Sequence, residues 1–134
     1  MAGLLRMTQA VLPAMRERGF GRIVNISSGT TRRVAVRVGA YAASKTAVNM
    51  LSSVLRQELA DDGIAVSLLL PSVTATEFGN GQFTLGASPR PGMVVQSPDY
   101  AAGFVLRLLR TGEESFDIPH GPEQPDLAQA SPSA

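Results

Sequence analysis

RIVNISS, at residues 22–28, is the stretch that decides the fold of this chain. Ile23, Val24 and Ile26 make it a short run of β-branched apolar residues, which is typical of a buried strand. The Ser-Ser-Gly sequence that follows ends the strand. Ligands of an open parallel sheet bind beyond the carboxyl ends of its strands, so Ser28 lies where we expect chemistry. The alternative for a serine in this place is a turn that its hydroxyl stabilises.

YAASK, at residues 41–45, carries a second chemical signal. Lys45 is the only lysine among the twelve lysine and arginine residues, and it follows Tyr41, one of two tyrosines, by four positions. On a helix this spacing puts both side chains on one face, with roughly 5–6 Å between their Cβ atoms. An ammonium group there stabilises the phenolate, which suits Tyr41 to act as a general acid or base. The alternative is a solvated tyrosine beside a surface lysine.

Together these stretches resemble the active-site segment of the short-chain dehydrogenase/reductases. A third motif agrees, because PSVTAT at residues 71–76 resembles the family's Pro-Gly-x-x-x-Thr cofactor segment, with Ser72 in place of the glycine. The similarity extends from about residue 2 to residue 118. It implies an α/β fold, a partial Rossmann-like doubly wound parallel sheet that corresponds to the C-terminal half of a single-domain member.

The resemblance also implies an activity. Members of the family are NAD(P)-dependent oxidoreductases that transfer a hydride between nicotinamide and a small-molecule alcohol or ketone. Tyr41 would exchange a proton with the substrate oxygen, Ser28 would hydrogen-bond the same oxygen, and Lys45 would bind the cofactor ribose. The residues implied to bind the cofactor are Tyr41, Lys45, Pro71, Ser72, Val73 and Thr76. The cofactor is NAD or NADP, since the residues that choose between them in the family have no counterpart here.

The sequence before residue 22 holds no glycine-rich phosphate-binding motif. In dinucleotide-binding domains that motif follows the first strand and holds the pyrophosphate. We therefore expect residues 1–118 to be the C-terminal part of a dinucleotide-binding domain that lacks its N-terminal cofactor-binding half and is inactive alone. From residue 119 the richness in Pro, Gln, Ala and Ser predicts a disordered tail over residues 119–134.

Apolar spacing divides residues 1–118 into helices and strands. The predicted elements are helices 2–18, 42–60 and 98–110, strands 22–28, 64–70 and 116–118, and a mobile loop over 79–96. Because helix 42–60 connects strands 22–28 and 64–70, we expect these strands to lie parallel and adjacent. Ser28, Tyr41 and Lys45 should then meet at the carboxyl edge of the sheet.

Composition argues against several other classes of protein. A net charge of +1 gives no reason to expect a nucleic-acid partner. No apolar stretch approaches the length of a membrane span, and without cysteine there is no thiolate metal site. His120, the only histidine, has no other ligand residues clustered near it in sequence, so we expect no metal. We expect a cytoplasmic protein.

Arg32, Arg33 and Arg37 lie between the predicted catalytic serine and tyrosine. They border the substrate pocket that the family resemblance implies. Two interpretations stay open for them, namely contact with an anionic substrate and a solvated loop without a binding role.

Two other functions remain. Besides the oxidoreductase, the chain could be a non-catalytic remnant that binds an intact homologue. The third candidate is a sugar epimerase-type relative. In the family, the helices that correspond to residues 2–18 and 42–60 commonly form the subunit interface. The resemblance therefore implies a homo-oligomer through these two helices, or binding of a homologue by the same helices.

Overall fold

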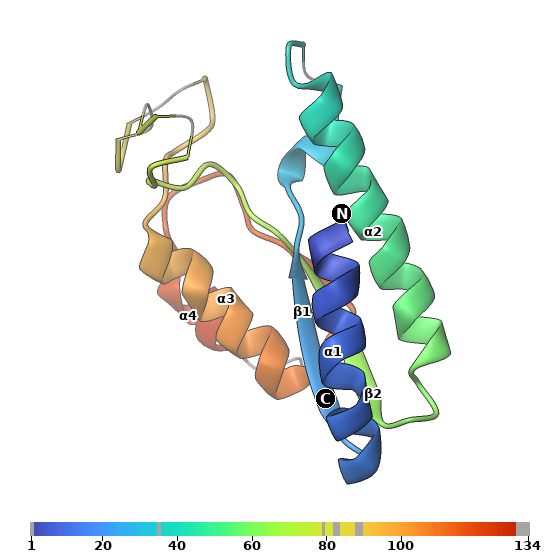
Figure 1. Cartoon of the computed structure of the whole chain (residues 1–134). Coiled ribbons are helices and arrows are strands. Elements are labelled where there is room, and N and C mark those ends of the chain that lie inside the picture. Colours follow the sequence, from blue (N-terminus) through green and yellow to red (C-terminus); the bar gives the residue numbers. More distant parts are fainter. Residues whose placement is uncertain (1, 35, 79, 82–83, 88–89, 131–134) are drawn as a thin grey trace.

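The computed structural model describes residues 2–34, 36–78, 80–81, 84–87 and 90–130 (Figure 1). Helices and strands alternate along the chain, as the apolar spacing predicts. In chain order the elements are α1 (Ala2–Arg18), β1 (Gly21–Ile26), the 3-10 helix η1 (Gly29–Arg32), α2 (Gly39–Glu58), β2 (Ile64–Leu70), α3 (Pro98–Thr111), β3 (Ser115–Asp117) and α4 (Pro125–Gln129). No helix in the described part of the chain is both long and apolar enough to cross a membrane.

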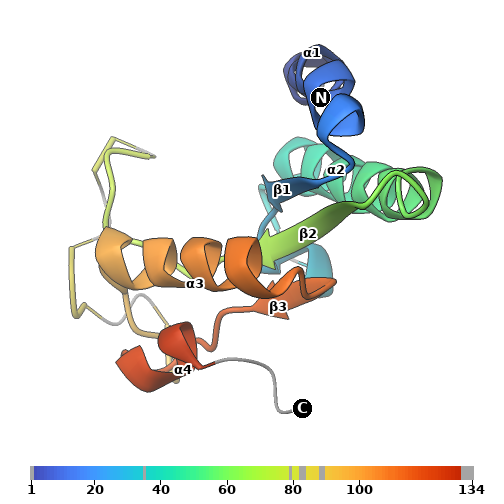
Figure 2. The same cartoon turned by 90° about the horizontal axis from the view of Figure 1, so that it is seen from below.

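The three strands form one parallel sheet in the order β1-β2-β3. β1 and β2 pair in register from Gly21 with Ile64 to Ile26 with Leu69, so the expected parallel and adjacent arrangement is confirmed. Helices α1 and α2 cover one face of the sheet, and α3 and α4 cover the other (Figure 2). This three-layer arrangement is a partial Rossmann-like fold of the predicted class.

β2 is the central strand, and it is buried on both faces. On one face Val66 packs with Leu55 of α2, and on the other Leu69 packs with Phe104 and Leu108 of α3. A strand between two helical layers has no solvent-facing side, which explains why residues 64–70 are almost continuously apolar. The two apolar clusters fix α2 and α3 on opposite sides of the same strand.

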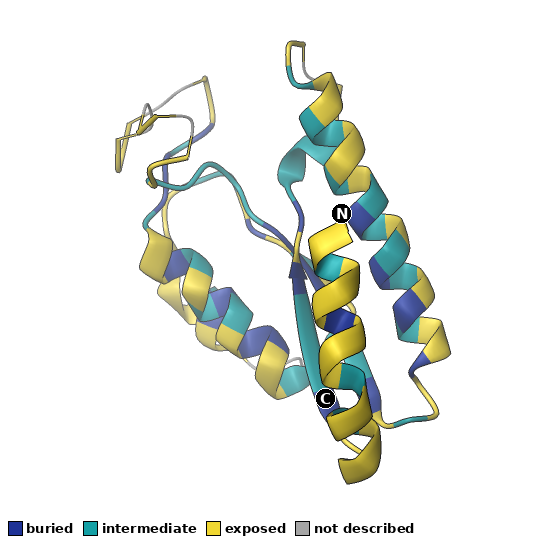
Figure 3. Ribbon diagram, viewed as in Figure 1, coloured by how far each residue is buried: buried dark blue, intermediate teal, exposed yellow. Residues whose placement is uncertain are grey.

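β1 lies at one edge of the sheet and is less protected. Ile23 and Val24 are only half-buried, and Ile26 is 41% exposed. Figure 3 shows this difference in burial between the edge strand and the faces of the helices that pack on the sheet. A strand edge with apolar side chains and unpaired backbone groups is a surface that favours pairing with other protein.

Several element boundaries differ from those expected. β1 ends at Ile26, two residues early, because the hydroxyl of Ser28 caps η1 instead of continuing the strand. Helix α2 begins at Gly39, so Tyr41 lies inside its first turn. The prediction of a mobile loop is wrong for its C-terminal part, since Val95 and Gln96 are each only 1% exposed. Residues 79, 82–83 and 88–89 of that loop lie outside the described residues.

The predicted disordered tail is wrong for residues 119–130. Helix α4 packs on α3, where a Cβ added to Gly103 would lie 2.9 Å from the Cβ of Ala128. Ala128 is buried, and Arg107 Nη1 donates a hydrogen bond of 2.6 Å to the carbonyl of Leu127. Leu127 and Ala128 are the apolar residues of this mostly polar stretch that pack in the core, and two such residues are too weak a compositional signal to see in the sequence. Residues 131–134 lie outside the described residues.

Gln96 joins the segments that follow β2 and β3. Its backbone N–H donates to the carbonyl of Val73 at 2.9 Å, and its carbonyl accepts from the N–H of Ala75 at 2.8 Å. Its buried side-chain amide donates to the carbonyls of Pro119 at 2.7 Å and Gly121 at 2.9 Å. One residue therefore holds two strand-end segments together at the carboxyl edge of the sheet.

Replacing Gln96 by leucine should destabilise the fold. Gln96→Leu leaves the carbonyls of Pro119 and Gly121 without their donor, so we expect the free energy of unfolding to fall by about 2–3 kcal/mol. Urea unfolding of the variant measures this loss. The matched control is Gln57→Leu, which changes an exposed glutamine on α2 and should shift the midpoint little. Equal stabilities of the two variants would contradict the role of Gln96.

A second polar link ties the end of α3 to the central strand. Arg107 Nε and Nη2 donate to the two carboxylate oxygens of Glu113 at 2.9 and 3.1 Å, and Thr111 Oγ1 donates at 3.0 Å. The backbone carbonyl of Glu113 accepts a 2.6 Å hydrogen bond from Ser67 Oγ on β2. The hydrogen bonds from Arg107 hold the pKa of Glu113 below its usual value, although partial burial opposes them.

The contribution of Glu113 should therefore depend on pH. A carboxyl group whose pKa is lowered by folding stabilises the protein above its unfolded pKa, about 4.3, and this stabilisation is lost as pH falls through the folded pKa. We expect Glu113→Gln to lower the free energy of unfolding by about 1–2 kcal/mol at pH 7 and to have little effect below about pH 3. Urea titrations across this pH range test the expectation.

Glu114→Gln is the control for this prediction. Its side chain is 72% exposed and pairs with Arg56 at 2.8 Å. An exposed ion pair contributes little, so this variant should change stability by less than about 1 kcal/mol at any pH. A pH-independent effect of Glu113→Gln would show that the carboxylate charge is not what stabilises this link.

Candidate active site

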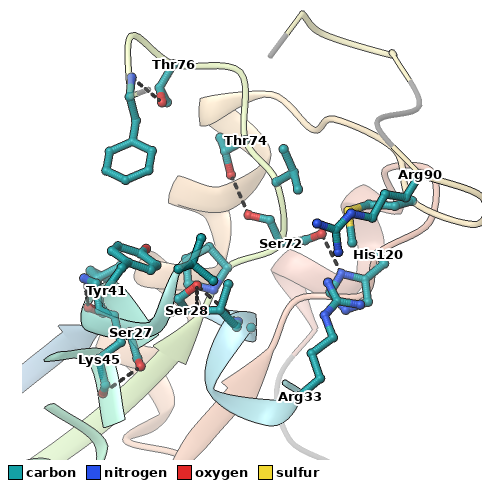
Figure 4. Close-up of a pocket in the computed structure, with 18 of the residues that line it drawn as sticks. Ser27, Ser28, Arg33, Tyr41, Lys45, Ser72, Thr74, Thr76, Arg90 and His120 are labelled. Carbon is teal, nitrogen blue, oxygen red and sulfur yellow. Dashed lines mark hydrogen bonds between the residues drawn. The ribbon is translucent and has the colours of Figure 1, made fainter. Parts of the chain in front are cut away.

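A cavity of about 680 Å³ lies beyond the carboxyl ends of the parallel strands. Its walls come from the segments after β1, β2 and β3, from the start of α2 and from the segment that precedes α3 (Figure 4). All the residues predicted to act in catalysis or cofactor binding line this one cavity, namely Ser28, Tyr41, Lys45, Pro71, Ser72, Val73 and Thr76. The structure thus brings together three motifs that are far apart in the sequence.

Ser28 is placed by the 3-10 helix that follows it. Its backbone is extended, with φ of −159°, and its Oγ accepts a 3.2 Å hydrogen bond from the N–H of Thr30 as the N-cap of η1. The hydroxyl of Thr30 donates to the same oxygen at 3.0 Å. A serine hydroxyl has one donor and two acceptor positions, so Ser28 keeps its hydrogen available for a donor role in the cavity.

Asn49, which was not among the predicted site residues, fixes the loop that carries Ser28. Buried Ser27 donates its hydroxyl hydrogen to Asn49 Oδ1, and Asn49 Nδ2 donates to Thr31 Oγ1 at 3.1 Å. One amide on α2 therefore holds residues on both sides of Ser28. The signal was present in the sequence, because Asn49 follows Tyr41 and Lys45 at the same four-residue spacing and so lies on the same helix face.

Tyr41 and Lys45 lie on successive turns of α2. Lys45 Nζ donates a 3.0 Å hydrogen bond to the carbonyl of Ile26, the last residue of β1, and lies 5.9 Å from the ring centroid of Tyr41. The Tyr41 ring also lies near the ring of Phe78, with 5.7 Å between the ring centroids and an interplanar angle of 46°. The carbonyl uses one of the three ammonium hydrogens, so two remain for a ligand in the cavity.

Ser72, which replaces the family glycine, has turned its side chain toward His120. Ser72 Oγ lies 2.7 Å from His120 Nδ1, and the two residues belong to the segments after β2 and β3 (Figure 4). The non-glycine residues of the described chain with positive φ are Arg37 and Asn80, so Ser72 needs no glycine-type backbone conformation. The serine therefore fits this turn without strain, and its hydroxyl binds the ring of His120.

Thr76 and Pro71 complete the wall formed by the segment after β2. Thr76 Oγ1 accepts a 3.2 Å hydrogen bond from the N–H of Phe78, which leaves the threonine hydrogen available to donate to a ligand. The carbonyl of Pro71 accepts from the N–H of Gly29 at 3.1 Å. This bond fastens the segment to the start of η1, next to Ser28.

The predicted arginines separate into two groups. Arg33 and Arg37 line the cavity, whereas Arg32 forms an ion pair with Asp117 in which Nε and Oδ2 are 3.1 Å apart. Arg90 and His120 also line the cavity, although sequence reasoning did not assign them to it. They lie 45 or more residues beyond Lys45, the last residue of the catalytic motif, and only the folded chain shows that they belong to the same site. In the described part of the chain, no three His, Cys, Asp or Glu side chains are grouped so as to hold a metal ion.

Known proteins resemble this chain in both sequence and structure. A very-long-chain 3-oxoacyl-CoA reductase of Macaca fascicularis is 36% identical over 102 residues, which are 76% of this chain and 33% of that protein. An inactive hydroxysteroid dehydrogenase-like protein 1 of Danio rerio is 35% identical over 109 residues, which are 81% of this chain and 33% of that protein.

The solved structure of a short-chain dehydrogenase from Sphingobium yanoikuyae in complex with NADPH superposes with a TM-score of 0.75. It is 30% identical, and the match covers 89% of this chain and 45% of that one. The chain thus spans about a third of the length of the two relatives and under half of this structure.

A family model confirms the resemblance that the three motifs suggested. The model, described as short chain dehydrogenase, matches residues 1–84, which include β1, α2 and β2. The matched part thus holds Ser28, Tyr41, Lys45 and the segment after β2. On this match, the chain belongs to the short-chain dehydrogenase family.

Proposed function

We propose that the protein is an NAD- or NADP-dependent oxidoreductase that transfers a hydride between nicotinamide and an alcohol or ketone. The observation that carries the proposal is that Ser28, Tyr41 and Lys45 line one cavity at the carboxyl edge of the parallel strands. The names of two similar proteins support it, since one is a 3-oxoacyl-CoA reductase and the other is a dehydrogenase in complex with NADPH.

In the reductive direction, Tyr41 donates the proton of its hydroxyl to the carbonyl oxygen of the substrate. Ser28 donates a hydrogen bond to the same oxygen, because Thr30 already occupies the acceptor positions of its hydroxyl. Lys45 places a positive charge 5.9 Å from the centroid of the Tyr41 ring, on the side of the cavity where proton transfer would take place. In the oxidative direction the same groups act in reverse, with Tyr41 as the general base.

The residues present fit the nicotinamide end of the cofactor. The two free ammonium hydrogens of Lys45 suit ribose hydroxyls, and the hydroxyl of Thr76 suits the carboxamide. The cavity volume is in the usual range for a small-molecule site. The nicotinamide, when bound, would supply or accept the hydride, and this chain's residues would orient the substrate and move the proton.

We further propose that the part that binds the cofactor phosphates is supplied by residues outside these 134. Backbone N–H groups of a glycine-rich turn hold pyrophosphate in such folds, and the sequence before β1 has no such motif. We expect the 134-residue chain to show no measurable binding of NADH or NADPH by isothermal titration calorimetry, and a longer product of the same gene with that motif to bind. Micromolar binding by the 134-residue chain would contradict this expectation.

In the cofactor-binding form, Tyr41→Phe tests the assigned proton transfer. Removing the hydroxyl should lower turnover by at least about a thousandfold, while cofactor affinity changes little, because the substitution deletes the proton donor and keeps the ring. Lys45→Arg should impair both turnover and binding, since a planar fork cannot replace a point charge.

The control is Tyr100→Phe, which changes the chain's other tyrosine. Tyr100 is buried against α3 neighbours, and its hydroxyl has no hydrogen-bond partner in the described structure. Removing that hydroxyl should leave turnover unchanged. Normal turnover by Tyr41→Phe would rule out the role proposed for Tyr41.

We also propose that α1 and α2 form an interface with a second copy of the protein. Both helices expose large apolar side chains, among them Met7, which is 67% exposed, and Met50 and Val54, which are 67% and 43% exposed. The paired substitutions Met50→Lys and Val54→Lys should shift sedimentation velocity toward monomer. Leu106→Lys on α3, which covers the opposite face of the sheet, should not.

The same surface supports the alternative of a non-catalytic chain that binds an intact homologue. One similar protein is named an inactive dehydrogenase-like protein, so loss of activity has a precedent among the relatives. The two functions separate in one measurement. Turnover that depends on Tyr41 supports the oxidoreductase, and its absence in every cofactor-binding form of the protein supports the binding role.

A further inference from the structure

We infer that the cavity takes a carbonyl or alcohol substrate that carries an anionic group, and that Arg33, Arg90 and His120 bind this group. The inference rests on the proposed function and adds the class of substrate. The anion is a carboxylate or a phosphate, since both present oxygen acceptors that a guanidinium can bind in pairs.

The charge of the cavity favours an anion. The described residues that line it include Arg33, Arg37, Lys45 and Arg90, and none of those lining residues is aspartate or glutamate. The protein as a whole has nearly balanced charges, with twelve basic and eleven acidic residues. The lining of the cavity is thus more positive than the protein as a whole, and a cleft lined by one sign of charge attracts ligands of the opposite charge.

Three separate segments bring the proposed anion-binding residues to one side of this cavity. Arg33 directly follows η1, Arg90 lies between β2 and α3, and His120 follows β3. In Figure 4 the side chains of Arg33 and Arg90 extend toward His120. The neighbouring Arg32 is not part of the cavity lining, and it pairs with Asp117.

His120 is held in place from several directions. Its carbonyl accepts a 2.9 Å hydrogen bond from the N–H of Val94, and Gln96 binds the carbonyls on both sides of it, those of Pro119 and Gly121. Ser72 Oγ lies 2.7 Å from Nδ1. When the Ser72 hydroxyl donates to Nδ1, Nε2 carries the ring hydrogen and is a donor for an anion. A donor fixed before binding loses little entropy when the ligand arrives.

The anion-binding residues are separated from the proton-transfer pair. Figure 4 shows Tyr41 and Lys45 on one side of the cavity, and Arg33, Arg90 and His120 on the other. Lys45 is already bonded to the carbonyl of Ile26 at the end of β1. A substrate that spans the cavity would place its carbonyl oxygen at Tyr41 and its anionic group at the arginines. The cationic cluster would then select for substrate length as well as charge.

Kinetics with matched substrates test this inference in the cofactor-binding form of the protein. The substrates are methyl ketone acids of increasing chain length, each paired with its uncharged methyl ester, and the corresponding oxoalkyl phosphates. At the best chain length we expect kcat/KM for the acid or the phosphate to exceed that for the ester by about tenfold or more. The ratio of acid to phosphate identifies which anion the site prefers.

Arg33→Gln and Arg90→Gln should each lower kcat/KM for the anionic substrate by about tenfold and leave the ester unaffected. Arg33→Lys keeps the charge and should recover part of the loss. Arg110→Gln removes the same charge from the end of α3, away from the cavity lining, and should have no effect. Arg33 is exposed, so its substitution should not unfold the protein, and circular dichroism checks this.

A binding measurement separates this inference from the proposed function. Calorimetry with 4-oxopentanoate or an oxoalkyl phosphate, in the presence of NAD⁺ and NADP⁺, allows no turnover of a ketone. Weaker binding to Arg33→Gln with unchanged binding to Arg110→Gln supports the anion site even if no reductase activity is found. Turnover of esters and acids at equal rates, or a loss in the variants that falls on cofactor affinity alone, would overturn the inference and leave the proposed function standing.

Discussion

The parallel pairing of β1 with β2 is the constraint on which the site depends. It brings the carboxyl ends of both strands to one edge, and the burial of β2 between α2 and α3 holds that edge in place. Because α2 crosses back between the two strands, its first turns arrive at the same edge. Ser28 and Tyr41 therefore line the same cavity because the backbone brings them there, and not because they bond to each other.

The features that sequence reasoning predicted correctly are local ones. Strand 64–70 and helix 2–18 have the expected boundaries, because apolar periodicity and the Gly19 and Pro71 that follow these elements act over a few residues. The Tyr41–Lys45 pair could be assigned to one helix face for the same reason. The pairing of β1 and β2 also follows from a short-range rule, since a helix between two strands leaves few other connections.

The features that sequence reasoning missed depend on contacts between distant segments. Gln96 looked like part of a loop, but its backbone bonds the segment after β2 and its side-chain amide bonds the segment after β3. His120 looked like an isolated residue at the start of a tail, and it contacts Ser72 across 48 positions. Helix α4 is held by a small apolar contact and one arginine, which composition alone could not reveal. The spacing of residues along the sequence does not reveal contacts of this kind.

Gln96 also marks a boundary between two parts of the chain. We expect the sequence before it to vary in length and composition, and the segment after β2 that it holds to stay fixed. The residues between Thr76 and Met93 precede the anchor, while the backbone bonds of Gln96 to Val73 and Ala75 keep the segment after β2 in register. Insertions, deletions or exchanges between Phe78 and Arg90 would thus change the cavity lining near Arg90 without displacing Ser28 or Lys45. Surface loops tolerate such changes in length at small cost, so new substrate preferences could evolve on this frame while the proton-transfer machinery is inherited intact.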